Sequence, residues 1–130
     1  AVIRAAKSPY NVNAVSQEMA RILLQNEQYA RVYPELLLAS RDMLITGLKT
    51  LEREGALQKV YDSCTNFAYI RVEGARWIFD RLADNGIIVR CFGDDFLRIT
   101  AGTQAENSEL LASLRFLLQY RREHPEEAEK

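Results

Sequence analysis

The sequence predicts a small α+β domain, an α/β two-layer sandwich in which long helices cover a small, mainly antiparallel sheet. Short runs rich in β-branched and aromatic residues alternate with turn signals, and longer segments carry apolar residues at helical spacing. The chain has 130 residues, of which 48% are hydrophobic, and this is enough for the core of one domain. The expected strands are 57–61, 67–72, 87–92 and 96–100.

The first half of the chain predicts two helices after an extended entry segment at 1–13. Asn13 can cap the first helix, in which apolar residues recur at helical spacing. Pro34 suits the first turn of a second, long amphipathic helix, and Gly55 is a natural stop. Gly47 lies inside that helix, where it marks either close packing or simple tolerance.

Two further helices are expected in the second half. Apolar spacing predicts a helix over 74–85, with Trp77 off its buried stripe as a partner surface or a partly buried edge. Thr103 and Glu106 have the spacing of a capping box, so the last helix starts at a well-marked point. From Arg121 onwards the chain is charged, and we expect it to fray.

The stretch 86–103 reads as a hairpin that carries two arginines. A three-residue loop at 93–95 would pair Phe92 with Phe96 and place Arg90 directly opposite Arg98. Two like charges facing each other across a ladder repel unless something negative lies between them. Because a guanidinium grips carboxylate or phosphate with a two-pronged fork, the pair suits a doubly charged anion.

A simpler interpretation of the same hairpin needs no ligand. Both arginines would be solvated and neutralised by Asp94, Asp95 or Glu73. On the pattern alone, this interpretation ranks above an anion site.

The composition excludes several classes of function. Lys and Arg number 17 against 18 Asp and Glu, which argues against a nucleic-acid or membrane-surface partner. The two cysteines, Cys64 and Cys91, lack metal or redox spacing and are expected to be reduced, in a cytoplasmic protein without a membrane span. His124 is the only histidine and lies in a charged tail, so no metal site and no catalytic residue is expected.

Three motifs carry a resemblance to a known family. The run GIIVR at 86–90, the run LRITAGT at 97–103 and the pair Glu106-Asn107 resemble the carboxy-terminal signature of histidinol-phosphate aminotransferases, which are fold-type I pyridoxal-phosphate enzymes. The run PYNVN at 9–13, followed by Ser16-Gln17, is a second match, and 65–72 is a looser third. The chain departs from the usual pattern at Ala101, Ala105 and Asp62 without touching either arginine.

The resemblance implies a division of labour between this chain and a missing large domain. Residues 1–13 would be the entry segment from that domain, and 14–130 the carboxy-terminal small domain. A first residue other than Met agrees with such a fragment, and removal of a tag would give the same start. The cofactor and its Schiff-base lysine would belong to the large domain, since none of the four lysines here stands in that family motif. The fragment would then bind no pyridoxal phosphate and be inactive alone, while the parent would be a homodimer.

The resemblance also assigns roles to residues. Arg98 would bind the carboxylate or phosphate of the substrate, Arg90 the phosphate of histidinol phosphate, and Tyr10 and Asn11 would stand at the cleft wall. The activity implied is transamination between histidinol phosphate and the 2-oxoglutarate/glutamate pair in histidine biosynthesis. The small domain of a threonine-phosphate decarboxylase or of an aromatic aminotransferase remains an alternative, as does a non-catalytic anion-binding α/β module.

The first helix is expected to pack incompletely in the absence of the large domain. Its apolar residues around Val15, Met19 and Ile22 would then be exposed, because they would bridge to that domain in the parent.

Overall fold

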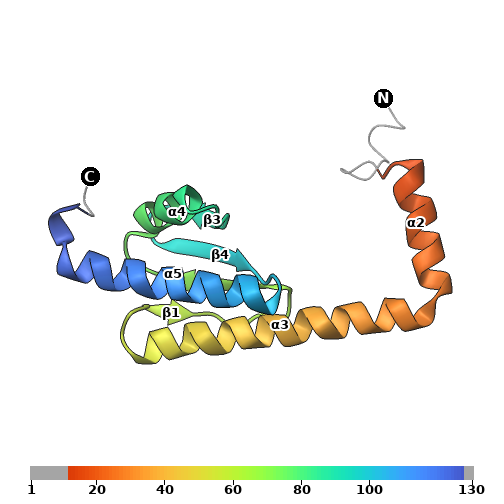
Figure 1. Ribbon diagram of the computed structural model, residues 1–130, viewed down its shortest axis with the longest axis horizontal. Helices are drawn as coiled ribbons and strands as arrows, with labels where there is room; N and C mark the ends of the chain where they lie inside the picture. Colours follow the sequence, from red (N-terminus) through yellow and green to blue (C-terminus); the bar gives the residue numbers. More distant parts are fainter. Residues whose placement is uncertain (1–11, 128–130) are drawn as a thin grey trace, which may run out of the picture. The chain divides into compact units, whose positions relative to one another are not determined.

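A computed structural model describes residues 12–127 of the chain (Figure 1). They fall into two compact units, divided between residues 35 and 36, which are described separately. The elements are α2 (Ala14–Gln25), α3 (Glu27–Arg53), β1 (Lys59–Val60), β2 (Phe67–Arg71), α4 (Ala75–Asp84), β3 (Arg90–Phe92), β4 (Phe96–Thr100), α5 (Gln104–Glu123) and the short 3-10 helix η1 (Pro125–Glu127).

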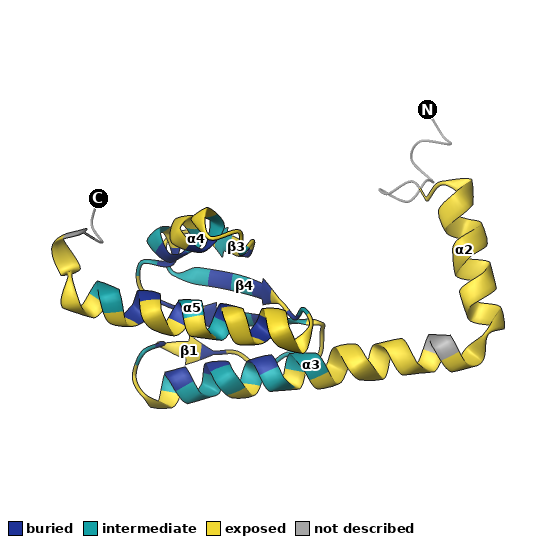
Figure 2. Cartoon of the chain, in the orientation of Figure 1, coloured by how far each residue is buried: buried dark blue, intermediate teal, exposed yellow. Residues whose placement is uncertain are grey.

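The first unit consists of α2 and the start of α3. The side chain of Asn13 accepts a hydrogen bond from the backbone N–H of Ser16 at 2.9 Å, so the expected cap is confirmed. None of the residues of α2 is buried (Figure 2). Val15, Met19 and Ile22 are 73%, 59% and 47% exposed, which confirms the expected apolar surface.

The start of α3 differs from the expectation. The helix begins at Glu27 and contains Pro34, which is therefore not in its first turn. Asn26 ends α2, donating its backbone N–H to the carbonyl of Leu23 and its side-chain amide to that of Ile22. Because Glu27 then supplies an acidic residue at the positive end of a new helix, α3 starts there and tolerates the missing N–H of the proline.

The second unit contains a four-stranded sheet with the order β1-β2-β4-β3, and every neighbouring pair is antiparallel. The predicted α+β architecture is therefore confirmed. Three strands are shorter than expected, although β2 ends only one residue early, at Arg71. The N–H of Ile87 donates to the carbonyl of Leu82 at the end of α4, so β3 starts only at Arg90. β1 is reduced to Lys59–Val60, although backbone bonds of Gln58 and Tyr61 continue its pairing with β2.

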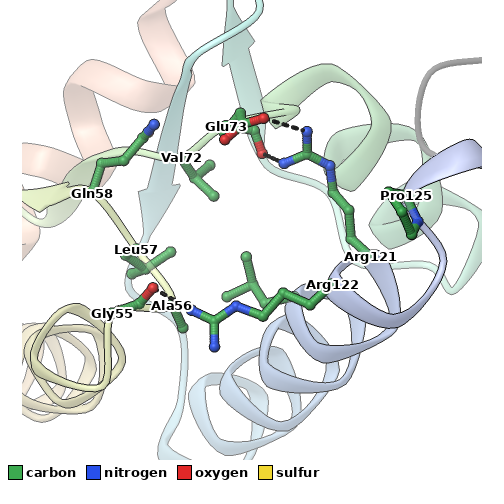
Figure 3. Close-up of a pocket in the computed structure, with 10 residues that line it drawn as sticks. Gly55, Ala56, Leu57, Gln58, Val72, Glu73, Arg121, Arg122 and Pro125 are labelled. Carbon is green, nitrogen blue, oxygen red and sulfur yellow. Dashed lines mark hydrogen bonds and ion pairs between the residues drawn. The ribbon is translucent and has the colours of Figure 1, made fainter.

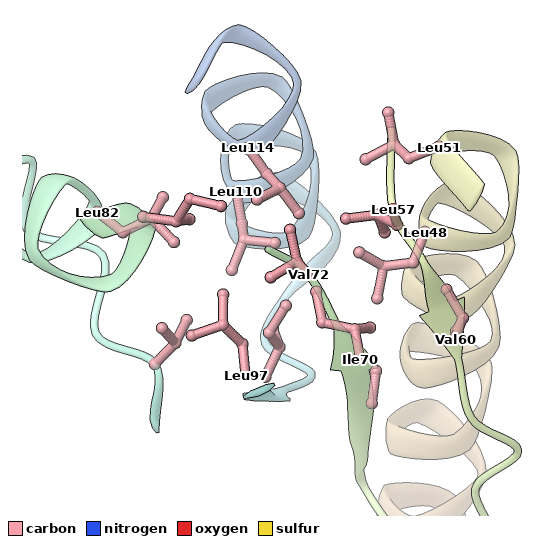
Figure 4. Close-up of a cluster of buried hydrophobic side chains, with 14 of the residues drawn as sticks. Leu48, Leu51, Leu57, Val60, Ile70, Val72, Leu82, Leu97, Leu110 and Leu114 are labelled. Atoms are coloured by element: carbon pink, nitrogen blue, oxygen red, sulfur yellow. The ribbon is translucent and has the colours of Figure 1, made fainter. Parts of the chain in front are cut away.

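The core lies between one face of the sheet and three helices (Figure 4). Along β2 and β4 the residues alternate, so that Ala68, Ile70, Leu97 and Ile99 point into the core. The helices contribute apolar side chains that are buried, namely Leu44, Leu48 and Leu51 of α3, Ala75, Ile78 and Leu82 of α4, and Leu110, Leu114, Leu117 and Leu118 of α5. α4 thus joins the two long helices as part of the covering layer.

Close packing between α3 and α5 explains Gly47. A Cβ at this position would lie 2.4 Å from a terminal methyl group of Leu111, so the glycine allows the two helices to approach. Trp77 is a partly buried edge residue that stacks on Tyr120, with ring centroids 6.3 Å apart.

The end of α5 is more ordered than its charge suggested. The helix continues to Glu123, and Arg121 donates a hydrogen bond to the carbonyl of Glu73 while Arg122 donates to that of Gly55. Both arginines therefore bind loops at the end of the helix, and the expectation of fraying from Arg121 is wrong.

Candidate functional site

The two hairpin arginines face each other as expected. In the ladder between β3 and β4, Phe92 pairs with Phe96 and Arg90 pairs with Arg98. Gly93 has a φ of 61°, in the left-handed region that glycine enters without steric cost, and it starts the three-residue loop. The local turn rule was thus sufficient to give the register of the hairpin.

The tip of the hairpin is held by two backbone hydrogen bonds, one from the residue after β2 and one from the first residue of α4. The N–H of Val72 donates to the carbonyl of Asp95 at 2.8 Å, and the N–H of Ala75 donates to that of Asp94 at 2.9 Å. Since the loop is joined to a buried part of the domain, the sheet presents the two arginines on a fixed backbone.

The face of the sheet opposite the core carries an aromatic cluster of four residues, Tyr61, Tyr69, Phe92 and Phe96. The ring of Tyr69 stacks on that of Phe96 with centroids 5.4 Å apart and an interplanar angle of 8°. Its centroid lies 5.7 Å from that of Tyr61 and 6.0 Å from that of Phe92. Because Tyr69 is also the ladder partner of Arg98, the cluster borders the arginine pair.

The nearby carboxylates serve other arginines. Asp95 pairs with Arg71 at 3.4 Å, and Glu73 pairs with Arg121 at 3.1 Å. Within residues 12–127, no carboxylate forms an ion pair with Arg90 or Arg98. The two facing positive charges therefore lack the neutralisation by Asp94, Asp95 or Glu73 that the simpler interpretation requires.

The two arginines differ in their surroundings. Arg90 is exposed, whereas Arg98 is half-buried, with its guanidinium carbon 5.0 Å from the ring centroid of Phe67 and 6.0 Å from that of Phe92. The Nε atom of Arg98 is buried and finds no hydrogen-bond acceptor among the described residues. Arg98 is consequently a half-buried cation with unused donors, and Arg90 is a solvated one.

Asn107 anchors the strand that carries Arg98. This buried residue of α5 accepts a hydrogen bond from the N–H of Gly102 at 3.0 Å, just beyond the end of β4. Its side-chain amide donates to the carbonyl and hydroxyl oxygens of Ser40 on α3 at 3.1 and 2.8 Å. A single side chain thus joins the end of β4 to two helices, a role that the sequence analysis missed although the residue stood in a motif.

A cavity of about 320 Å³ lies elsewhere, between the carboxyl end of α5 and the loops 55–58 and 72–73 (Figure 3). Arg121 and Arg122 line it, but their guanidinium groups already bind Glu73 and the carbonyl of Gly55. The negative end of the α5 dipole also disfavours an anion there. Since neither hairpin arginine lines this cavity, the open face of the sheet remains the candidate site.

Other predicted features are placed as follows. Tyr10 and Asn11 lie outside the described residues. Cys64 and Cys91 are free thiols, and burial raises the pKa of Cys91. His124 is exposed at the end of α5 and stacks on Tyr120. Between residues 12 and 127, no three acidic, cysteine or histidine side chains gather as a metal site, and no helix has the length and hydropathy to cross a membrane.

Comparison with solved structures identifies the class of fold. The histidinol-phosphate aminotransferase from Clostridium acetobutylicum matches with a TM-score of 0.73 and 21% identity, over 91% of this chain and 37% of that one. A decarboxylase from Sulfurospirillum multivorans matches with a TM-score of 0.58 and 20% identity, over 84% and 33%. The domain therefore has the α+β fold found within aminotransferases and at least one decarboxylase.

Sequence comparison is more specific. Histidinol-phosphate aminotransferase of Ruminiclostridium cellulolyticum is 32% identical over 117 residues, which cover 86% of this chain and 32% of that enzyme. The enzyme of Clostridium novyi is 35% identical over 113 residues, with 84% and 31% covered. No family model matches the sequence. The chain is related to the histidinol-phosphate aminotransferases, as its motifs indicated, and spans about a third of the length of these curated relatives.

Proposed function

We propose that this chain is the carboxy-terminal small domain of a pyridoxal-phosphate aminotransferase, and that it binds the anionic end of the substrate. The proposal rests on the arginine pair of the open face, which has no carboxylate partner among the described residues. Two relatives that are 32% and 35% identical carry the name histidinol-phosphate aminotransferase, which supports histidinol phosphate as one substrate. Glutamate with 2-oxoglutarate would be the other pair.

The two arginines would bind different parts of the negative charge on the substrate. Arg98, which is half-buried, would bind the anionic end of each substrate, whether carboxylate or phosphate. Arg90, which is exposed and directly opposite, would add a second fork for the dianionic phosphate. Tyr10 and Asn11 would contribute to the cleft wall from the entry segment 1–13.

The two lysines among the described residues support the proposal that the pyridoxal-phosphate anchor lies elsewhere in the parent enzyme. Lys49 pairs with Asp62 at 3.1 Å and Lys59 with Glu52 at 3.6 Å, so both described lysines are surface ion-pair partners. The cofactor, which supplies the amino-group transfer chemistry, would be held by the rest of the parent enzyme. The exposed apolar residues of α2 would pack against that large domain.

Two assays on matched preparations test this proposal. The longer protein that contains this chain should exchange the amino group between histidinol phosphate and 2-oxoglutarate when pyridoxal phosphate is present. The chain of 130 residues alone should show neither turnover nor a stoichiometric cofactor absorbance band. A stoichiometric band together with turnover in the short chain would contradict the division of labour.

Substrate choice separates the alternatives within the same preparations. Release of carbon dioxide from threonine phosphate, without turnover of histidinol phosphate, would replace the proposal by a decarboxylase. Transfer of the amino group to 2-oxoglutarate from aromatic amino acids alone would indicate an aromatic aminotransferase. A longer protein that binds phosphate but performs none of these reactions would be a non-catalytic anion-binding protein.

A further inference from the structure

The side chain of Arg98 lies between two aromatic rings that come from different strands. Phe67 pairs with Thr100 across the β2–β4 ladder, and Phe92 pairs with Phe96 across the β3–β4 ladder. One ring therefore comes from the strand on each side of β4. Phe67 lies toward the Thr100 end of β4 and Phe92 toward the Phe96 end, with Arg98 between them. Their centroids lie 5.0 and 6.0 Å from the guanidinium carbon, within the range of a cation–π interaction.

The orientation of the guanidinium adds to this geometry. Its Nε atom is buried and without an acceptor among the described residues, and no ion pair with them holds its terminal nitrogens. The ring contacts are then the interactions that fix the side chain in the absence of ligand. A guanidinium is planar and weakly hydrated, so it is suited to such stacking.

We propose that Phe67 and Phe92 are positioning residues that hold the fork of Arg98 ready for the substrate anion. This inference rests on the proposed function of Arg98 and adds two residues to which the motifs assigned no role. A long side chain that is already ordered loses less conformational entropy on binding than a free one. Arg90, which is exposed and has no cation–π contact with a ring of the described residues, would become ordered only with ligand.

The test compares substitutions that keep apolar volume with substitutions that keep the ring. Phe67→Leu and Phe92→Leu each remove one ring, whereas Phe67→Tyr and Phe92→Tyr retain it. Tyr61→Leu is the matched control, because Tyr61 lies on the same face but its ring contacts are with Tyr69 and Phe96, not with Arg98. Two separate rings give two independent leucine variants, so the failure of one to fold leaves the other as the test.

The first measurement uses the chain of 130 residues without ligand. Nuclear magnetic resonance should show the Nε–H of Arg98 shifted by ring currents and protected from exchange with water. Both signatures should weaken in Phe67→Leu and in Phe92→Leu, and persist in the tyrosine variants and in Tyr61→Leu. Unchanged Arg98 signals in both leucine variants would overturn the proposal.

The second measurement is a titration of the same samples with inorganic phosphate. Loss of one ring should raise the dissociation constant for phosphate about twofold to fivefold, as expected for one cation–π contact at a partly exposed site. Equal affinity in wild type and leucine variants would overturn the positioning role. Arg98 could show the ring signatures in the wild-type chain while neither this chain nor the longer protein binds phosphate. In that case the proposed function fails, but the packing of Arg98 between the rings stands.

Discussion

The side-chain amide of Asn107 donates hydrogen bonds to the carbonyl and the hydroxyl of Ser40, which lies 67 residues earlier in the chain. Asn107 also accepts from the N–H of Gly102, so one buried side chain on α5 satisfies polar groups on α3 and after β4. Buried polar groups that lose their partners keep the full cost of desolvation. The position of the strand that carries Arg98 therefore depends on this residue.

Asn107→Ala should lower the free energy of unfolding by about 1 to 3 kcal/mol, because it leaves the buried N–H of Gly102 without its partner and removes both amide bonds to Ser40. The hydroxyl of Ser40 keeps its hydrogen bond to the carbonyl of Gly102. The measurement is urea unfolding, with midpoint and slope compared separately. Ser108→Ala, at an exposed position of the same helix, is the control and should stay within about 0.5 kcal/mol of wild type. Equal stability of the two variants would show that the network contributes nothing.

Leu48→Ala should lower the free energy of unfolding by about 2 to 5 kcal/mol. Leu48 of α3 is fully buried in the core against the sheet, and loss of its side chain leaves a cavity. Leu24→Ala, at a helical position that is 72% exposed, is the matched control and should change the stability little. The measurement is again urea unfolding, which gives the free energy of unfolding of both variants. A large loss in the exposed variant, with a small one in the buried variant, would contradict the assignment of the core to residues 36–127.

The capping box at the start of α5 predicts a pH dependence. A hydrogen bond from the backbone N–H of Thr103, and a further one from its side chain, hold the pKa of Glu106 below its usual value of about 4.5. A depressed pKa in the folded state means that this contribution is complete above pH 4.5 and is lost as the pH falls through the folded pKa. Glu106→Gln should therefore flatten the fall of stability below that pH.

The control for this prediction is Glu109→Gln, which removes the same charge from an exposed position of the same helix. The measurement is the free energy of unfolding at a series of pH values between neutral and acid. If both variants keep the wild-type slope below pH 4.5, the box does not contribute to the acid sensitivity.

The hairpin was predictable because its register follows from local rules. A three-residue loop at Gly93 and the alternation of side chains determine that Arg90 faces Arg98, and the structure has this pairing. The start of β3 was not predictable in the same way. The N–H of Ile87 donates a hydrogen bond to the carbonyl of Leu82 at the end of α4, so it is not available for the sheet. The β-branched residues of this segment favour a strand and do not indicate such a bond.

The non-local parts of the site required the structure. The contact of Phe67 with Arg98 depends on the pairing of β2 with β4, two strands that α4 and β3 separate in the chain. The binding of Arg121 to Glu73 depends on the packing of α5 and converts a charged tail into an ordered helix end. Composition and periodicity carry no information on either contact, because both depend on how distant segments meet.

The central claim, that the facing arginines bind the substrate anion, is tested most directly by kcat/KM for the two half-reactions in the longer enzyme. Truncating one member of a buried charge pair costs about 2 to 5 kcal/mol, so Arg98→Ala should reduce both half-reactions by the corresponding factor. Arg90→Ala should weaken the reaction of histidinol phosphate more than that of glutamate, and lysine at either position should restore only part of the activity. Equal and small losses at both positions, for both substrates, would show that the hairpin is a solvated edge of the sheet and would contradict the claim.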